Sequence, residues 1–250
     1  MDSEIQTESR SMAKRIWQFP LVAMIVGLVL ILAAAAVTSV IVRFVIAPNL
    51  DGPIVDILAV LLIVTLCGLT YKLLVRKLGP KQHDDLPLDM RAVRDTAAGF
   101  GLGAVLISVC VGLAALAGVY RITGTDNFAD GVQIIFWFGI YAGFFEELVT
   151  RGIILRWLEE FAGSWIALVL SALIFGFGHA ANDNATVFSS LAIAIEAGIL
   201  LGAAYMLTRS LWLAIGIHAG WNVVQALWDV PVSGNPTSGP IAATLDGPWL

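Results

Sequence analysis

The chain has 250 residues, of which 58% are hydrophobic and 13% are charged, with a net charge of -5 and a mean hydropathy of +0.86. Soluble domains carry about 25% charged residues, and a soluble protein of this size could not bury so many apolar side chains. The composition therefore excludes a soluble protein and predicts one that crosses a membrane several times.

The N-terminal region begins with a polar leader of 15 residues, and an apolar run from Ile16 to Ile46 follows it. The apolar core of a cleavable signal peptide has about 7–15 residues, and this run is about twice as long. We therefore interpret it as a signal-anchor helix that keeps the leader in the cytoplasm.

Seven apolar segments are long enough, or nearly so, to cross about 30 Å of hydrocarbon. The segments are residues 17–46, 54–75, 95–119, 132–157, 164–180, 186–207 and 211–229. We predict an all-α polytopic membrane protein, a bundle of about seven transmembrane helices. The chain divides into a leader, three N-terminal helices, a C-terminal helical core and a Gly/Pro-rich tail, at residues 1–15, 16–125, 130–230 and 231–250.

The distribution of Lys and Arg predicts the orientation, because short cytoplasmic loops of membrane proteins carry an excess of both. With the N-terminus in the cytoplasm, only Arg43 and Arg121 fall outside, and Arg151 lies within a membrane segment. The cytoplasmic residues are then Arg10, Lys14, Arg15, Lys72, Arg76, Lys77, Lys81, Arg91, Arg94, Arg156 and Arg209. This strong asymmetry predicts a cytoplasmic N-terminus.

Two connections are polar. Residues 79–94, the longest cytoplasmic connection, contain His83 and several charged residues, and we expect a solvated loop with an ordinary surface histidine. The tail lacks helical periodicity and is rich in Gly and Pro, so we expect an external loop or a partly folded segment.

Four pairs of glycines are spaced four residues apart within the apolar segments. Small residues at this spacing let membrane helices approach one another closely. The pairs, which predict packing faces, are Gly99 and Gly103, Gly139 and Gly143, Gly198 and Gly202, and Gly216 and Gly220.

Reactive polar side chains are concentrated in the C-terminal apolar segments. A charge at bilayer depth costs about 2.5–3.5 kcal/mol, yet Glu146 and Glu147 are adjacent in the fourth segment. At 1.5 Å per residue, Glu146, His179 and Asn222 lie roughly 20 Å from the cytoplasmic ends of their segments, and His218 roughly 13 Å. Similar depth on three helices predicts a site inside the membrane.

Each part of this group has a simpler interpretation on its own. Glu147 and Arg151 have the spacing of a helix-stabilising ion pair, and the other polar side chains could simply join helices by hydrogen bonds. Glu196, in the sixth segment, has no basic neighbour four residues away. It either donates an interhelical hydrogen bond as a protonated acid or lines a cavity.

Patterns of several protease classes are absent from the sequence. It has no H-E-x-x-H zinc motif, no G-x-S motif in a membrane segment and no pair of membrane aspartates. A glutamate and a histidine that act on water remain, since a carboxylate can serve as general base. An imidazole N–H and an asparagine amide are suitable donors for an oxyanion.

These residues resemble the three motifs of the CAAX protease and bacteriocin-processing family of intramembrane endopeptidases, which includes type II prenyl-protein proteases and many abortive-infection proteins. The resemblance covers about residues 130–225 and rests on E-E-x-x-x-R (Glu146, Glu147, Arg151), F-x-x-x-H (Phe175, His179) and H-x-x-x-N (His218, Asn222). It implies a helical bundle around an intramembrane catalytic cavity, which opens toward the cytosol in the best-known members.

The resemblance also implies a role for each polar motif residue. Glu146 and His179 would activate the attacking water, and His218 and Asn222 would form the oxyanion hole.

Glu147 and Arg151 would hold the helix and orient the histidines from behind the reacting groups. The resemblance favours a metal-independent glutamate mechanism without a cofactor. Glu146, His179 and His218 could alternatively bind zinc, because two histidines and a carboxylate are a known zinc ligand set.

The sequence thus predicts an intramembrane endopeptidase, with residues 130–230 as its catalytic core. We expect it to cleave a membrane-associated substrate with a prenylated or hydrophobic C-terminus, in contact with membrane lipid and without a nucleic-acid partner. The resemblance favours a bacterial inner membrane. Two alternatives stay open: a non-enzymatic immunity or scaffold protein, and a proton-coupled transporter that uses Glu146, Glu147 and Glu196 as a relay. The clustering of these groups at one depth argues against the transporter.

Overall fold

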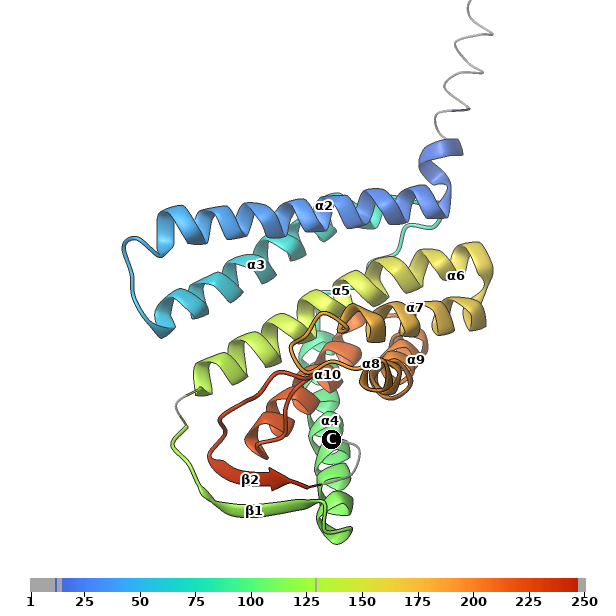
Figure 1. The fold of residues 1–250 in the computed structure, drawn as a ribbon. Helices are drawn as coiled ribbons and strands as arrows, with labels where there is room; N and C mark the ends of the chain where they lie inside the picture. Colours follow the sequence, from blue (N-terminus) through green and yellow to red (C-terminus); the bar gives the residue numbers. More distant parts are fainter. Residues whose placement is uncertain (1–11, 13–14, 129, 247–250) are drawn as a thin grey trace, which may run out of the picture.

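The computed structural model describes residue 12, residues 15–128 and residues 130–246. Helices occupy each of the seven predicted apolar segments (Figure 1). The three N-terminal helices are α2 (Pro20–Ile41) with η1 (Val42–Ile46), α3 (Pro53–Leu73) with η2 (Val75–Lys77), and α4 (Met90–Leu116). The fourth segment is one long helical run of η3 (Gln133–Glu146), α5 (Glu147–Val149), η4 (Thr150–Leu155) and α6 (Arg156–Ala162). The last three segments are α7 (Ser164–Gly178), the run of α8 (Val187–Ile193), η5 (Ala194–Gly198) and α9 (Ile199–Thr208), and α10 (Leu211–Leu227).

Among the described residues, four helices are long and apolar enough to cross a membrane, namely Pro20–Ile46, Pro53–Lys77, Met90–Leu116 and Val187–Thr208. Helices α7 and α10 are apolar but have 15 and 17 residues, which gives them lengths of about 22 and 26 Å. The chain is therefore a mostly helical, polytopic integral membrane protein, and the predicted number of seven spans stays a prediction.

A two-stranded antiparallel sheet corrects the expectation of an all-α fold. Strand β1 (Tyr120–Thr125) follows α4 and pairs with strand β2 (Ile241–Leu245) in the tail, with Tyr120 opposite Leu245. Backbone groups outside helices need hydrogen-bond partners when they pack against the protein. The pairing supplies those partners, so part of the tail is an ordered strand (Figure 1).

Helices α4 and α10 run parallel and touch through their glycines. A Cβ atom on Gly103 would lie 2.2 Å from the carbonyl oxygen of Ile217, and one on Gly220 would lie 2.2 Å from that of Phe100. Gly99 and Gly216 are equally close to the opposite backbone. No larger side chain fits without moving a helix, so the predicted packing role of these two glycine pairs is confirmed.

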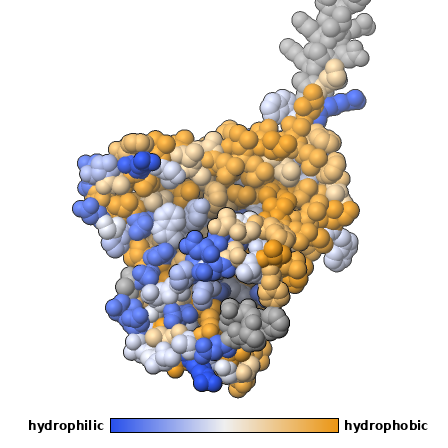
Figure 2. Space-filling view, in the orientation of Figure 1, coloured by the Kyte–Doolittle hydropathy of each residue, from blue (hydrophilic) through white to orange (hydrophobic). Residues whose placement is uncertain are grey.

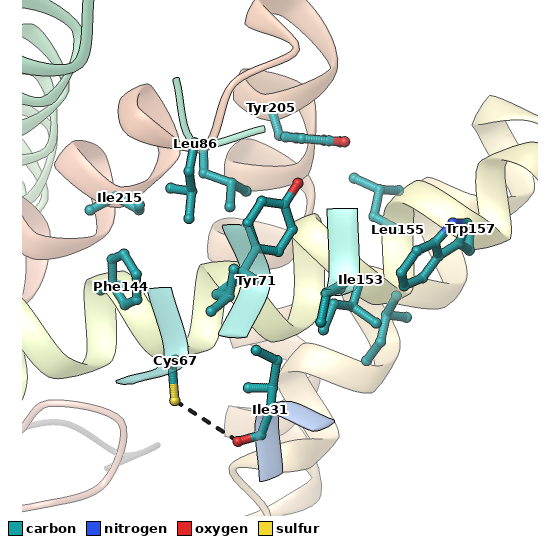
Figure 3. Close-up of a cluster of buried hydrophobic side chains, with 14 of the residues drawn as sticks. Ile31, Cys67, Tyr71, Leu86, Phe144, Ile153, Leu155, Trp157, Tyr205 and Ile215 are labelled. Carbon is teal, nitrogen blue, oxygen red and sulfur yellow. Dashed lines mark hydrogen bonds between the residues drawn. The ribbon is translucent and has the colours of Figure 1, made fainter. Parts of the chain in front are cut away.

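The largest buried apolar cluster joins α2, α3, α6 and α9 (Figure 3). Its largest side chain, Trp157, is fully buried and contacts the position that Gly27 leaves open on α2. Cys67 lies in the same cluster, with its sulfur 3.9 Å from the backbone oxygen of Ile31. The cluster holds the N-terminal helices against the run that carries the two adjacent glutamates.

The connection between α3 and α4 packs against the bundle, which corrects the expectation of a solvated loop. Asp85 is 1% exposed and accepts hydrogen bonds from Tyr71 (2.5 Å), Tyr205 (2.9 Å) and Arg156 (2.9 Å). A carboxylate can be buried when opposite charge and hydrogen bonds surround it. His83 remains half exposed at the surface, where its Nδ1 lies 2.8 Å from Asp85.

The outer surface is apolar along the helices. Large hydrophobic side chains such as Leu32, Val40 and Leu113 are more than half exposed on α2 and α4. Figure 2 shows this hydrophobic surface over the upper right of the molecule, whereas hydrophilic residues gather at the lower left, around the two strands. Such a surface requires lipid as its solvent.

Candidate active site

The two adjacent glutamates lie in the middle of the long helical run from η3 to α6. Glu146 ends the π-helical segment η3, and Glu147 begins α5. Helical turns of the π type are rare and occur frequently at functional sites. One turn earlier, a Cβ atom on Gly143 would lie 3.1 Å from the backbone oxygen of Ile215. This run therefore approaches α10 closely where both helices carry polar groups.

Glu146 faces the two membrane histidines. Its Oε2 atom lies 3.5 Å from Nε2 of His179 and 3.9 Å from Nε2 of His218. Both distances exceed the 2.7–3.2 Å typical of a direct hydrogen bond. The same oxygen is buried and has no hydrogen-bond partner in the protein. The carboxylate of Glu146 therefore keeps one oxygen that the protein leaves without a donor, next to two imidazoles.

Hydrogen bonds fix the tautomers of the two histidines. The Nδ1–H of His179 donates to the backbone oxygen of Phe175 (2.8 Å), which leaves its Nε2 as an acceptor toward Glu146 when the ring is neutral. The Nδ1–H of His218 donates to Oε1 of Glu147 (2.8 Å). Since a carboxylate can only accept, Nε2 of His218 carries a proton only in the imidazolium form.

Glu147 and Arg151 are fully buried and form the predicted ion pair. Oε1 of Glu147 lies 2.8 Å from Nη1 of Arg151. Together with Glu146 and an imidazolium at His218, the four charges would sum to zero. Such compensation reduces the large cost of placing charge in apolar surroundings.

Arg151 also connects this run to the neighbouring helices. It donates a 3.0 Å hydrogen bond to the backbone oxygen of Gly198 in η5, and its guanidinium lies 4.4 Å from the centre of the Phe175 ring. That ring packs edge-on against His179 and His218, with centroid distances of 4.9 and 5.8 Å. The ion pair thus positions the histidines through Phe175 as well as through Glu147.

Asn222 lies one turn beyond His218 on α10, as the four-residue spacing predicts. Its side chain is buried and donates a 3.1 Å hydrogen bond to the backbone oxygen of Phe138. An amide NH2 group has two hydrogens. The second hydrogen is left for another acceptor, and Asn222 lines the cavity next to Glu146.

The cavity has a volume of about 550 Å³, which is typical of a ligand pocket. Glu146, His179 and Asn222 lie in its wall, whereas His218 lines a smaller cavity of about 100 Å³ that Asn222 also borders. The structure therefore brings the predicted polar residues of three helices to one place.

Several lining residues were not identified from the sequence. An aromatic row on η3 consists of Trp137, Tyr141 and Phe145, with ring centroids 5.2 and 5.3 Å apart. Their four-residue spacing before Glu146 was a usable signal. Asn182 and Ser233 reach the cavity from loops, and no spacing rule could have indicated them.

Glu196 is exposed on η5 and lines the smaller cavity with His218 and Asn222. Of the two interpretations given to this residue, the position favours cavity lining. In residues 12, 15–128 and 130–246, no group of three or more His, Cys, Asp or Glu side chains is arranged to hold a metal ion. The zinc alternative remains to be tested by chelation.

A comparison with protein families finds a match for the C-terminal half of the chain. Residues 128–224 match the family described as Rce1-like, type II CAAX prenyl endopeptidase. The match extends from just before η3 into α10 and contains all three motifs. No curated protein and no solved structure matches the chain significantly. The resemblance predicted from the motifs is confirmed over this part of the chain.

Proposed function

We propose that this membrane protein, whose residues 128–224 match the family of Rce1-like type II CAAX prenyl endopeptidases, is a metal-independent glutamate endopeptidase. One observation carries the proposal. The Oε2 atom of Glu146 is buried, has no protein partner and lies within 4 Å of two imidazole nitrogens. That arrangement suits a water molecule that is held and deprotonated by the protein.

The first step is the activation of water by Glu146 and His179. Oε2 of Glu146 and Nε2 of neutral His179 both accept hydrogen bonds, so one water can donate to the two atoms together. Its oxygen lone pair is then directed away from both, toward a peptide carbonyl in the cavity. As the oxygen adds to the carbonyl carbon, its proton moves to Glu146.

The second step is the stabilisation of the oxyanion by α10. The imidazolium Nε2–H of His218 and the free amide hydrogen of Asn222 would donate to the carbonyl oxygen as it becomes negative. When the C–N bond breaks, Glu146 returns its proton to the leaving nitrogen. Glu147 and Arg151 touch no substrate atom in this scheme and act as positioning residues.

The substrate is a peptide bond in a membrane-associated protein. The wall of the cavity contains Trp137, Tyr141 and Phe145, which suit a hydrophobic or prenylated segment near the scissile bond. We place the protein in a bacterial inner membrane, as the motif resemblance favours. Glu146 lines the larger cavity and Glu196 lines the smaller one, an arrangement that gives no support to a continuous carboxylate relay in a transporter.

The experiment that tests this function measures cleavage of a quenched fluorescent peptide library, with and without a farnesylated C-terminal cysteine, by purified protein in detergent. The wild type, Glu146→Gln and His179→Ala are compared with and without a chelator. We expect turnover that survives the chelator and disappears in both variants. Turnover that the chelator abolishes and zinc restores would contradict the metal-independent mechanism. Equal turnover in Glu146→Gln would exclude the assigned general base.

A further inference from the structure

Glu196 is a charged residue inside a membrane helix that the proposed mechanism does not use. It is the only charged residue in the run Val187–Thr208, which is long and apolar enough to cross a membrane. Glu196 lies nine residues after the start of this run and twelve before its end, so it is about 14 and 18 Å from the two ends. A charge at this depth is costly unless it faces water or a group of opposite charge.

The described part of the protein supplies no such group. Among residues 12, 15–128 and 130–246, the Glu196 side chain makes no hydrogen bond and no ion pair. It is exposed, as are the apolar side chains of Ile195 and Ile199 on the same helix. The four charges of the catalytic cluster sum to zero when His218 is an imidazolium, so that cluster has no charge left for Glu196. A positively charged partner therefore has to come from outside this part of the chain.

The smaller cavity beside Glu196 has the size and lining for a long basic side chain. Its volume is about 100 Å³, whereas one water needs about 10–15 Å³. Apolar side chains form much of its wall, and Glu196 is its acidic group; the apolar residues include Ile193, Leu200, Leu201 and Ile217. Lys and Arg bury an apolar stem and keep a charged head, so they match such a wall.

His218 in the same wall does not prevent the binding of a cation. Its Nδ1 lies 2.8 Å from Oε1 of the fully buried Glu147. An imidazolium at this position is therefore compensated within the protein. Glu196 has no such compensation, so a cation in the smaller cavity would complete the charge balance there.

The two cavities adjoin one another at the proposed oxyanion hole. Phe175, Asn222 and Ser233 line both of them. In the proposed mechanism, Asn222 donates to the scissile carbonyl oxygen, so the substrate residues on the two sides of the scissile bond lie on the two sides of Asn222. The larger cavity, with its aromatic row, holds the hydrophobic or prenylated segment. The smaller cavity then receives the side chain from the other side of the bond.

We propose that the smaller cavity is a specificity subsite for a Lys or Arg side chain of the substrate, with Glu196 as its counter-ion. The inference rests on the proposed function and specifies its substrate, which is hydrophobic or prenylated on one side of the scissile bond and basic on the other. Glu196 selects the substrate in this scheme and touches none of the reacting atoms. The pairing removes an exposed, uncompensated charge from the middle of a membrane helix.

The first test compares quenched peptides that differ only in Lys or norleucine, which keeps the apolar stem without the amino group. The pair is placed at each position within two residues of the scissile bond. At one position we expect the wild type to cleave the lysine peptide with a kcat/KM that is about 10–100-fold higher. Glu196→Gln should lose this preference but still cleave the norleucine peptide. Glu160→Gln removes a carboxylate outside both cavities and should keep the preference.

Charge reversal separates recognition from a structural role. Glu196→Lys should prefer a peptide with Glu at the same position over the lysine peptide, whereas a structural defect would lower the cleavage of both peptides equally. A thermal scan in detergent shows whether each variant is folded, and Glu196→Gln decides the question if the reversed variant is not. Equal kcat/KM for lysine and norleucine peptides at every position in the wild type would overturn the subsite, while the proposed function would stand.

A binding measurement decides the subsite without catalysis. Labelled lysine and norleucine peptides are titrated by fluorescence anisotropy against Glu146→Gln and against Glu146→Gln with Glu196→Gln. We expect the lysine peptide to bind about 10–100-fold more tightly to the first protein and both peptides to bind equally to the second. This result without any cleavage by the wild type would contradict the proposed function but support the subsite. Equal affinity of the two peptides for the first protein, or no binding of either, would overturn the subsite.

Discussion

Among the residues that the structure describes, the carboxylate of Asp85 and that of Glu146 both lie in buried clusters of charge, and they differ in how completely they are paired. In the connection between α3 and α4, both oxygens of Asp85 accept hydrogen bonds, Oδ1 from Tyr205 and Oδ2 from Tyr71 and Arg156. In the cavity, Oε2 of Glu146 has no partner, although two histidines lie within 4 Å. The chemical groups are similar, but the number of unused acceptors differs.

This difference separates stability from reactivity. A buried carboxylate whose oxygens are both satisfied holds its helices together, because the removal of either partner leaves an unpaired charge. A buried oxygen without a partner does not hold helices together, so its position needs another explanation, such as a function or a bound water. Substitutions in the two clusters should therefore change different measured quantities.

The largest effect is expected for Glu146→Gln. Loss of the general base should reduce kcat/KM by about 10²–10⁴-fold. The thermal unfolding midpoint in detergent should fall only modestly, because Oε2 accepts no hydrogen bond from the protein and only its charge compensation is lost. Peptide cleavage and a thermal scan of the same preparation measure both. Glu160→Gln is the matched control, because Glu160 lies in α6 of the same helical run and outside the wall of the catalytic cavity, and it should keep its activity. A large loss of stability in Glu146→Gln would contradict the expected difference between Glu146, which serves catalysis, and Asp85, which serves stability.

The next effect is expected for Asp85→Ala, which leaves Arg156 buried without its carboxylate. The free energy of unfolding should fall by about 3–5 kcal/mol, while the folded fraction keeps its kcat because the cavity lies elsewhere. Denaturant titration in detergent measures the change. Asp84→Ala is the control, since Asp84 is partly exposed in its pairs with Lys72 and Arg76, and it should cost only about 0–1 kcal/mol. Lost activity at unchanged stability would contradict this assignment.

A smaller effect is expected for Asn222→Ala, which removes one oxyanion donor. In other enzymes such a change lowers kcat by about 10²–10³-fold. The lost hydrogen bond to Phe138 should lower the free energy of unfolding by about 0.5–1.5 kcal/mol. Gln225→Ala removes hydrogen bonds one turn further along α10 and serves as the control. If the two variants keep equal turnover, Asn222 has only a structural role.

The smallest effect is the pH dependence of stability that His83 contributes through its hydrogen bond to Asp85. The hydrogen bond to Asp85 raises the pKa of His83 above its ordinary value. Protonated His83 therefore adds stability, fully present below pH of about 6.5, and this contribution is lost as pH rises through the raised pKa. The unfolding midpoint of the wild type should fall over this range relative to that of His83→Gln. Parallel pH curves for the two proteins would contradict the assignment.

Much of the fold follows from local patterns in the sequence. The apolar segments predict where the helices lie. The pair Gly99 and Gly103 predicts a packing face, which the structure places against α10. The position of Asp85 could not be predicted, because its partners Tyr71, Arg156 and Tyr205 come from three different helices. Polar composition suggested a solvated loop, but distant opposite charge made burial favourable. Strands β1 and β2 could not be predicted for the same reason, because each pairs with a strand far away in the sequence.

The candidate site was more accessible to sequence reasoning than the fold around it. Spacings of four residues placed Glu147 next to Arg151 and Asn222 one turn from His218, and both positions follow from helix geometry. The contact between His218 and Glu147 joins two helices, so no local spacing contained it. Two further residues of the cavity wall, Asn182 and Ser233, lie in loops without a periodic signal.

The pairing of β1 with β2 has a consequence for biosynthesis. Proteins leave the ribosome from the N-terminus onward, and β1 precedes every proposed catalytic residue, whereas β2 follows the last helix. The sheet therefore closes only after α10 has been made, when Ser233 and Gly234 can also bind the loop after α7. During translation and insertion the nascent enzyme would lack this part of its cavity wall, so it would mature only once its final helix is in place.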